Sequence, residues 1–434
     1  MNNIIKKCKV IDKEYNYFTV ICDDAKPGRG KLSGLAISVK DCICVKDVES
    51  TAGSKILKGY RPLFDATVIE KIRKEGGMII GKTSQDAFGF GSFNTNVGLG
   101  FKVPKNPFDK ERTTGGSSGG GAGLTQKADF PHVALTESTG GSIENPAAFC
   151  GVIGFCPTYG RVSRYGLISY ADSLDKIGLM SKTVKDLRKV LEVISGYDDK
   201  DATSLKEKIN FESKTKKFKI GLIKFDQGVD PEIKTAVEGA VKKLKNVEVA
   251  EVSLPITFKY GIPTYYIIST SEASSNLARL CGLRYGIEGN PKNKSFNEYF
   301  SEIRSQNFNE ESKRRIILGT FARMAGYRDA YYIKATKVRT KIIDEYKNLF
   351  KTFDVIVSPT MPVVAPKFSE INKMSALQQY LMDVLTVGPN LAGIPHASIP
   401  VGNKEGLPIG LMACTDHLQE GKLLEFLQLV EDSS

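Results

Sequence analysis

Short apolar runs alternate with amphipathic stretches along the first part of the chain. Residues 35–39 (L-A-I-S-V) predict a buried strand that ends at Lys40, and residues 78–81 (M-I-I-G) predict another. Residues 66–74, between these two runs, have helical spacing. The order strand, helix, strand is typical of α/β proteins.

The same alternation continues along the rest of the chain. We therefore expect an α/β fold with a large mixed or mostly parallel central sheet covered by helices on both faces. We expect a single domain over residues 1–434, in which residues at about 197–260 form a peripheral subregion. Further strands are predicted at residues 132–135, 218–223, 247–254, 354–357 and 397–401, and helices at 232–244 and 312–350, the last interrupted by Gly319 and Gly326.

Composition narrows the class of protein. The chain has 434 residues, of which 41% are hydrophobic and 25% charged, and this excludes a disordered or collagen-like protein. No apolar run approaches the roughly 18 residues of a membrane helix. Residues 1–13 lack the apolar core of a signal peptide, so we expect a cytoplasmic protein without membrane contact. Eight scattered cysteines without a C-x-x-C pair, together with only three histidines, predict reduced thiols and no metal site.

Nearly half of the net charge of +12 lies in one segment. Residues 206–245 contain eleven lysines and six acidic residues, a net charge of +5. No aromatic residues alternate with these lysines in the manner of a nucleic-acid-binding motif. The pattern favours a solvated basic surface, and contact with an RNA or an acidic partner is the alternative.

Two clusters of serine and glycine are the strongest candidates for chemistry. The first follows Arg112 and reads T-T-G-G-S-S-G-G-G-A-G, without the G-x-x-x-x-G-K-[ST] pattern of a nucleotide P-loop. The second, T-G-G-S, offers consecutive unobstructed N–H groups directly before Ser142, an arrangement that suits an oxyanion hole beside a nucleophile. A serine nucleophile needs a base, and histidines are scarce. Lys40, at the end of a buried strand, can serve if burial disfavours its charged form.

These motifs resemble those of the amidase signature family. The resemblance rests on A-I-S-V-K-D (36–41), T-T-G-G-S-S-G-G (113–120) and T-G-G-S-I-x-x-P-A-A-F-C-G (139–151), in this order. Later segments, among them S-E-A-S-S-N-L-A-R (271–279) and K-R-R-I-I-L-G-T-F (313–321), are similar to one branch of the family. That branch comprises the A subunits of glutamyl-tRNA(Gln)/aspartyl-tRNA(Asn) amidotransferases. The resemblance thus implies the amidase signature fold.

The resemblance also implies roles for individual residues. The family uses a Ser-Ser-Lys triad in which the middle serine follows a cis peptide bond. Carried over by position, Ser142 is the nucleophile, Ser117 the bridging serine and Lys40, in its neutral form, the base. The resemblance further assigns the oxyanion hole to the N–H groups of Thr139, Gly140, Gly141 and Ser142, and substrate contacts to Tyr266, Arg315, Asp383 and Ser118.

Glutamine is the substrate that the resemblance implies. Arg315 would bind its α-carboxylate in bidentate fashion and Asp383 its α-ammonium. Tyr265 is an adjacent rival of Tyr266 for the tyrosine contact. Without the family context, a surface salt bridge is the commonest role of a helical arginine such as Arg315.

Several positions depart from the family pattern. Ser117 and Ser142 lie 25 positions apart, one more than in typical members. Ser138 stands where the family has an acidic residue, with Glu137 before it, and Glu144 stands where an arginine is common. The helical extension that precedes the lysine in bacterial members is mostly missing. These departures concern the surroundings of the triad rather than the triad itself.

The function implied is that of the glutaminase subunit of a tRNA-dependent amidotransferase. Such a protein hydrolyses glutamine and supplies ammonia for the conversion of mischarged Glu-tRNA(Gln), Asp-tRNA(Asn) or both. The implied partners are the amidotransferase subunits B and C of a heterotrimer, with mischarged tRNA bound mainly through the complex. No cofactor is expected in this chain, because ATP and Mg²⁺ would bind the kinase-like B partner. The alternatives are a stand-alone amidase for another small amide, and a catalytically silent scaffold in an RNA-binding complex.

Overall fold

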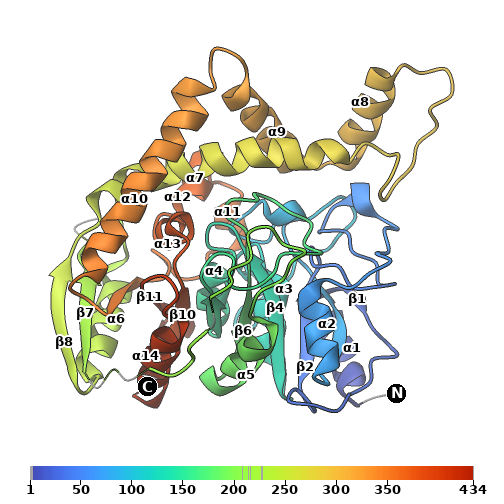
Figure 1. Cartoon of the computed structure of the whole chain (residues 1–434). Helices are drawn as coiled ribbons and strands as arrows, with labels where there is room; N and C mark the ends of the chain where they lie inside the picture. The colour runs from blue at the N-terminus through green and yellow to red at the C-terminus, as the bar shows by residue number, and fades with distance from the viewer. Residues whose placement is uncertain (1–2, 208, 214, 216, 226–227, 434) are drawn as a thin grey trace.

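A single mixed β-sheet forms the centre of the computed structural model, which describes residues 3–207, 209–213, 215, 217–225 and 228–433 (Figure 1). Five positions of the basic segment, 208, 214, 216 and 226–227, therefore lie outside the described residues. The eleven strands are β1 (Phe18–Ile21), β2 (Ala36–Lys40), β3 (Met78–Thr83), β4 (His132–Ser138), β5 (Ile153–Cys156), β6 (Lys176–Ser181), β7 (Phe218–Ile223), β8 (Val247–Val252), β9 (Val355–Pro359), β10 (His396–Lys404) and β11 (Leu407–Cys414). Their order across the sheet is β1-β3-β2-β4-β6-β5-β10-β11-β9-β7-β8.

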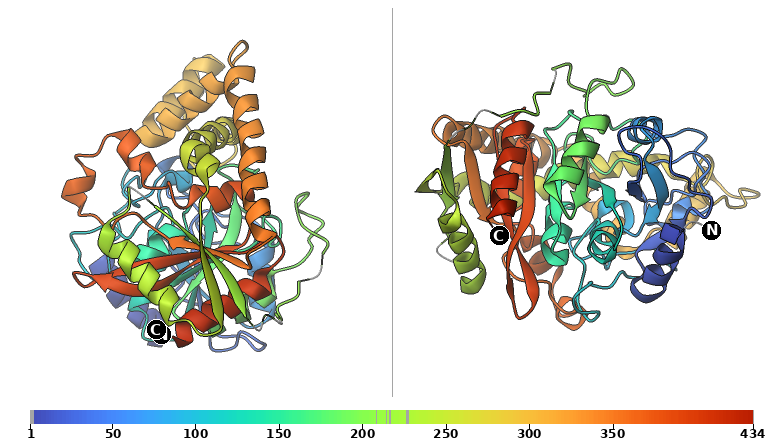
Figure 2. Two further views of the ribbon diagram at one scale, coloured as in Figure 1. Left: turned by 90° about the vertical axis from the view of Figure 1, so that its left-hand side faces the viewer. Right: turned by 90° about the horizontal axis from the view of Figure 1, so that it is seen from below.

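Helices cover both faces of this sheet (Figures 1 and 2). The chain also forms short 3-10 turns at Lys55–Leu57, Ala87–Gly89 and Leu277–Arg279. A π-helical turn lies at Asp329–Ile333. The α-helices are α1 (Asn3–Tyr15), α2 (Thr67–Lys74), α3 (Gly119–Lys127), α4 (Glu144–Cys150), α5 (Val184–Ile194), α6 (Pro231–Lys243), α7 (Pro255–Asn276), α8 (Phe296–Asn307), α9 (Glu310–Arg323), α10 (Lys334–Phe350), α11 (Phe368–Ile371), α12 (Ala376–Leu381), α13 (Val387–Ala392) and α14 (Glu420–Asp432).

The two faces of the sheet can be followed along β4, because successive side chains of a strand point to opposite sides. Val133 and Leu135 belong to the main apolar core, which includes residues of α2, α5 and α14. Ala134, between them, packs instead in a separate cluster with residues of α3 and α4. The expected α/β fold, with a large mixed sheet covered by helices on both faces, is thus confirmed.

The strand pairing brings the two ends of the predicted site together. β2 pairs in parallel with β4, with Val39 opposite Leu135. The carboxyl ends of parallel strands lie at the same edge of a sheet, so Lys40 at the end of β2 meets the segment that follows Leu135. That segment continues into the loop 139–142 and then into α4.

One expectation about the long helical stretch 312–350 is wrong. Gly319 does not interrupt a helix but lies inside α9, whereas the chain leaves the helix near Gly326, whose φ is +86°. Gly319 permits a close crossing of α9 and α7, because a Cβ at this position would collide with the carbonyl oxygen of Thr270.

Among the described residues, no helix is long and apolar enough to cross a membrane.

Replacement of Gly319 by alanine should therefore destabilise the fold. Overpacking of this kind costs about 1–3 kcal/mol, even though alanine favours helices. Gly239 in α6 is the matched control, because a Cβ there would meet no atom within 4 Å. Gly239→Ala should stabilise the protein by about 1 kcal/mol. Urea unfolding of both variants measures the difference, and equal free energies of unfolding would contradict the close crossing.

Candidate active site

Lys40 is fully buried at the end of β2, and its ammonium nitrogen has three oxygen neighbours. Its side chain is 0% exposed. Nζ lies 2.7 Å from Ser117 Oγ, 2.9 Å from the carbonyl oxygen of Glu137 and 2.8 Å from Glu137 Oε2. The predicted base and bridging serine are thus in direct contact.

Ser117 lies in the glycine-rich loop that leads into α3. The peptide bond between Gly116 and Ser117 is cis, as the family resemblance implies. Backbone hydrogen bonds hold this loop, from Gly116 N–H to Ser92 and from Asp86 N–H to the carbonyl of Ser117. Ser118, for which the resemblance implies a substrate contact, donates its hydroxyl to the Glu137 carbonyl oxygen at 3.1 Å.

Ser142 follows a tight loop between β4 and α4. Gly141 has φ +146°, and a Cβ there would collide with Thr386, so a glycine is required. The N–H of Gly141 donates to Ser138 Oγ, which differs from the expectation that all four N–H groups of the loop face an oxyanion. Within the described part of the chain, the N–H groups of Thr139, Gly140 and Ser142 have no protein acceptor. These three remain available for a developing negative charge.

The predicted substrate residues lie around one pocket beside Ser142. Arg315 of α9, Asp383 between α12 and α13, and both Tyr265 and Tyr266 of α7 line it, together with Gly140 and Gly141. Ser118 is not part of the lining. The structure therefore brings together a candidate nucleophile, a cation and a carboxylate.

Arg315 is buried rather than part of a surface salt bridge, with only 2% of its surface exposed. Its Nε donates to Glu311 at 2.7 Å, and its Nη1 to the Tyr170 hydroxyl at 2.6 Å. The rings of Phe90, Tyr170, Tyr266 and Tyr380 lie 5.1–5.7 Å from the guanidinium carbon. Because a guanidinium has five N–H donors, the remaining ones can bind an incoming carboxylate.

Asp383 is positioned to accept a cation. Tyr266 donates its hydroxyl to Asp383 Oδ2 at 2.8 Å. Burial raises the pKa of the Asp383 carboxyl to about 6, against the opposing effect of hydrogen bonds from Ser92 and Tyr266. Tyr265 packs against Gly140, where a Cβ would collide with its ring. Both tyrosines therefore reach the pocket, Tyr266 next to the carboxylate and Tyr265 next to the oxyanion loop.

Two buried acids beside the triad were not assigned a role from the sequence. The Thr139 hydroxyl lies 2.7 Å from Glu137 Oε1 and 2.8 Å from Asp175 Oδ1. A hydroxyl has one proton, so it can donate to only one of these oxygens, and the other carboxyl must donate in return. Burial and the nearby Glu137 raise the pKa of Asp175 well above its usual range, which identifies Asp175 as the protonated acid.

The sequence carried a signal for both acids. Asp175 lies in the S-L-D-K-I-G segment and Glu137 directly precedes S-T-G-G-S. What the sequence could not predict is their contact with Lys40 and with each other through Thr139. A carboxylate in contact with a lysine favours the charged ammonium. A neutral Lys40 therefore requires that Glu137 take its proton.

One buried group of side chains has metal-ligating atoms close together. Glu144, Cys156 and His396 offer ligand atoms within 4.8 Å of one another. Its carboxylate and imidazole already contact each other at 2.9 Å, and burial raises the pKa of the Cys156 thiol well above its usual range. This chemistry favours a proton-sharing pair over a metal centre. All eight cysteines are free thiols, six of them buried, as expected.

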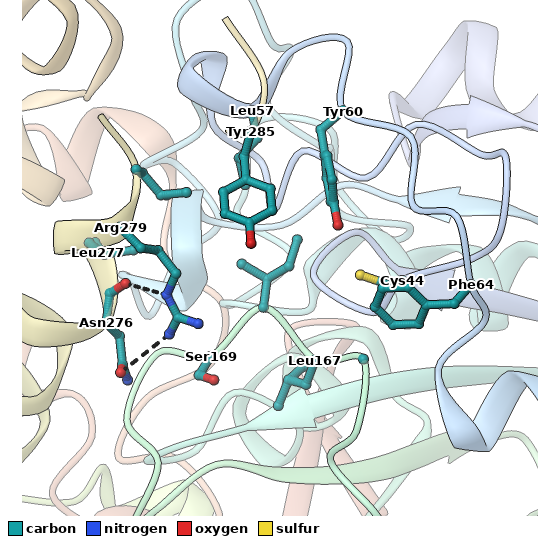
Figure 3. Close-up of a pocket in the computed structure, with 13 residues that line it drawn as sticks. Cys44, Leu57, Tyr60, Phe64, Leu167, Ser169, Asn276, Leu277, Arg279 and Tyr285 are labelled. Carbon is teal, nitrogen blue, oxygen red and sulfur yellow. Dashed lines mark hydrogen bonds between the residues drawn. The ribbon is translucent and has the colours of Figure 1, made fainter. Parts of the chain in front are cut away.

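A separate pocket of about 190 Å³ lies away from the triad. Figure 3 shows the rings of Tyr60 and Tyr285 on one side of it, and Arg279 held by Asn276 on another. Burial raises the pKa of the Cys44 thiol in its lining to about 11, so this sulfur is not an activated nucleophile. Ser142, Arg315 and Asp383 line the other pocket instead.

The fold and the site together define an amidase. The family model described as Amidase matches residues 3–424, and the chain belongs to the amidase family. The A subunit of the glutamyl-tRNA(Gln) amidotransferase of Archaeoglobus fulgidus is 46% identical over 398 residues, which cover 92% of this chain and 86% of that protein. The A subunit of the glutamyl-tRNA(Gln) amidotransferase of Koribacter versatilis is 45% identical over 450 residues, with coverage of 98% and 92%.

Solved structures give the same picture. The crystal structure of the glutamyl-tRNA(Gln) amidotransferase A subunit from Thermotoga maritima superposes with a TM-score of 0.83 at 35% identity, covering 99% of this chain and 91% of that chain. A 6-aminohexanoate cyclic dimer hydrolase has the same TM-score of 0.83 at only 20% identity, with coverage of 99% and 92%. The second likeness shows the fold alone. The same fold thus occurs in an amidotransferase subunit and in a 6-aminohexanoate cyclic dimer hydrolase.

Proposed function

We propose that this chain is the glutaminase subunit of a tRNA-dependent amidotransferase. The observation that carries the proposal is the charge pattern of the pocket beside Ser142. Arg315 and Asp383 line the same small pocket with opposite charges. This pattern matches the α-carboxylate and α-ammonium of a free amino acid, and the side-chain amide of bound glutamine would then face Ser142.

The first half of the reaction is acylation of Ser142. Its hydroxyl proton passes to Ser117 Oγ while the Ser117 proton passes to Lys40 Nζ, 2.7 Å away. Lys40 can accept that proton once its own ammonium proton lies on Glu137 Oε2, 2.8 Å away. Ser142 Oγ attacks the amide carbon, and the oxyanion is bound by the N–H groups of the loop 139–142.

The second half releases the products. Collapse of the tetrahedral intermediate breaks the C–N bond, and the proton on the relay is returned to the leaving nitrogen, which departs as ammonia. Water then attacks the γ-glutamyl ester with the same groups acting in reverse. The ester bond to Ser142 breaks and glutamate leaves.

In the cell, the ammonia would be consumed by partner proteins. We propose a cytoplasmic heterotrimer with subunits B and C, in which ATP and Mg²⁺ bind the B partner and mischarged Glu-tRNA(Gln), Asp-tRNA(Asn) or both are amidated. Relatives that are 45–46% identical and named as the A subunit of such an enzyme support this proposal. A stand-alone amidase is the second candidate, since the same fold serves other amides. The pocket lined by Arg315 and Asp383 favours glutamine, because it carries one group for each charge of a zwitterion.

Substitution of the nucleophile tests the chemistry. Ser142→Ala should reduce glutamine hydrolysis to background, because the proposed acyl-enzyme forms on the Ser142 hydroxyl, and Ser117→Ala should lose about 10²–10⁴-fold in kcat. Ser163→Ala is a matched control, because this fully buried serine bonds Asp198 outside the pocket. Ammonia release by each purified variant gives the readout. Glutamine turnover by Ser142→Ala would assign the nucleophile elsewhere.

The pKa of Asp383 predicts a pH dependence of substrate binding. The carboxylate form binds the ammonium of glutamine, and a pKa of about 6 means that this form is lost as the pH falls through 6. Below that pH, the KM for glutamine should rise about tenfold per pH unit. Asp383→Asn should raise the KM for glutamine at pH 8 and should abolish the further rise of KM below pH 6. A KM that is constant between pH 5 and 8 would argue against contact with the ammonium.

The experiment that separates the two candidate functions uses the complex. The chain, co-expressed with subunits B and C, should co-purify with both. Its glutaminase activity should increase when ATP and a mischarged Glu-tRNA(Gln) or Asp-tRNA(Asn) are added. The stand-alone amidase would be favoured if neither tRNA stimulates activity and the isolated chain hydrolyses other small amides.

A further inference from the structure

The peptide unit between Gly140 and Gly141 is hydrogen-bonded at both ends. Its carbonyl accepts from Thr386 Oγ1 at 2.8 Å, and its N–H donates to Ser138 Oγ at 3.2 Å. A peptide unit is planar, so two bonds at opposite edges fix its orientation. The peptide units that carry the N–H groups of Gly140 and Ser142 adjoin this anchored unit directly, one on each side.

The Ser138 hydroxyl can hold Gly141 only if its own proton points elsewhere. Its nearest acceptors are Glu144 Oε2 at 3.2 Å and Asn390 Oδ1 at 3.4 Å. A carboxylate is the stronger acceptor of the two. With the proton donated to Glu144, an oxygen lone pair remains for the N–H of Gly141.

Glu144 in turn is held by His396 at the start of β10. His396 Nδ1 lies 2.8 Å from the carbonyl oxygen of Ile394, which can only accept, so Nδ1 carries a proton. Nε2 lies 2.9 Å from Glu144 Oε1, and both side chains are 0% exposed. Burial opposes ionisation of Glu144, but the nearby His396 holds the pKa of the Glu144 carboxyl below its usual range.

We propose that Ser138, Glu144 and His396 are positioning residues for the oxyanion loop of this enzyme. They form one chain of contacts from β10 to the Gly140–Gly141 peptide and orient the N–H groups that bind the transition state. None of the three lines the substrate pocket, so they act through the loop and not on the substrate. The inference rests on the proposed role of Ser142 as nucleophile. Ser138 and Glu144 are also the two positions beside Ser142 where the chain departs from the family pattern.

A purely structural ion pair would have a different signature. Arg161 and Glu420 form such a pair in this chain, with Nε 3.3 Å from Oε1 and side-chain exposures of 1% and 0%. Neither residue lines the pocket or bonds to the loop 139–142. Loss of this pair should lower stability alone, whereas loss of the Glu144–His396 contact should also lower kcat.

Three substitutions test the proposal in the full-length chain with its partner proteins. Glu144→Met breaks the chain of contacts and should lower the kcat for glutamine about 10- to 100-fold with KM within twofold, since oxyanion donors act in the transition state. Glu144→Gln can accept from Ser138 and donate to His396 Nε2, so it should keep kcat within about threefold of the unsubstituted enzyme. Glu420→Met should lower the melting temperature and leave kcat and KM unchanged.

Ser138→Ala extends the test if Glu144→Met does not fold. It removes only the acceptor of the Gly141 N–H and should lower kcat about tenfold at unchanged KM. In a double variant with Glu144→Met the losses should not add, because both act through one chain. An unchanged kcat in folded Glu144→Met or Ser138→Ala would overturn the proposal, as would a loss in Glu144→Gln equal to that in Glu144→Met.

The same measurements separate this inference from the proposed function. If the unsubstituted complex hydrolyses another amide but not glutamine, the glutaminase assignment fails, and the kcat comparison is made on that amide. A kcat loss specific to Glu144→Met on any amide supports the positioning role. If Ser142→Ala keeps its activity, the loop does not carry the nucleophile and the positioning role fails with it.

Discussion

Burial of the Lys40 ammonium is the constraint on which the rest of the site depends. A charged lysine at 0% exposure is tolerated only when every donor has an oxygen, and Ser117 and Glu137 supply all three contacts. Those oxygens come from one loop and one strand, so the glycine-rich loop and the end of β4 must both close on the end of β2. The glycines allow this approach where side chains would collide, as at Gly116, whose Cβ would lie within 3 Å of the Asn94 and Phe93 backbone.

The charge of this cluster is balanced inside the protein. Lys40 and Glu137 compensate each other, and Asp175 avoids a second negative charge by keeping its proton. The same principle recurs across the pocket, where Arg315 is compensated by Glu311 and enclosed by aromatic rings. Each of these two buried cations is therefore paired with a buried carboxylate.

The sequence predicted the parts of this arrangement that depend on local pattern. The apolar runs located β2, β3 and β4, because both faces of these strands are buried, and the fold class followed from their alternation with helices. It did not predict β1, whose four residues are all only partly buried. It also did not predict β5, β6 and β11, or the order of the strands. It placed Lys40, Ser117, Ser142, Arg315 and Asp383 in one site through resemblance. It could not predict that Glu137 contacts Lys40 or that Ser138 binds Gly141, because these contacts depend on the exact path of loops that pattern does not encode.

The position of β10 has a consequence for how the enzyme comes into being on the ribosome. β5 pairs with β10, so the half of the sheet that carries the triad joins the other half only through a strand beginning at His396. Lys40, Ser117 and Ser142 are synthesised long before Arg315, Asp383 and His396. A nascent chain thus exposes its serine before it possesses either the amino-acid clamp or the support beneath the oxyanion loop. The complete set of site residues is therefore present only after synthesis has passed His396.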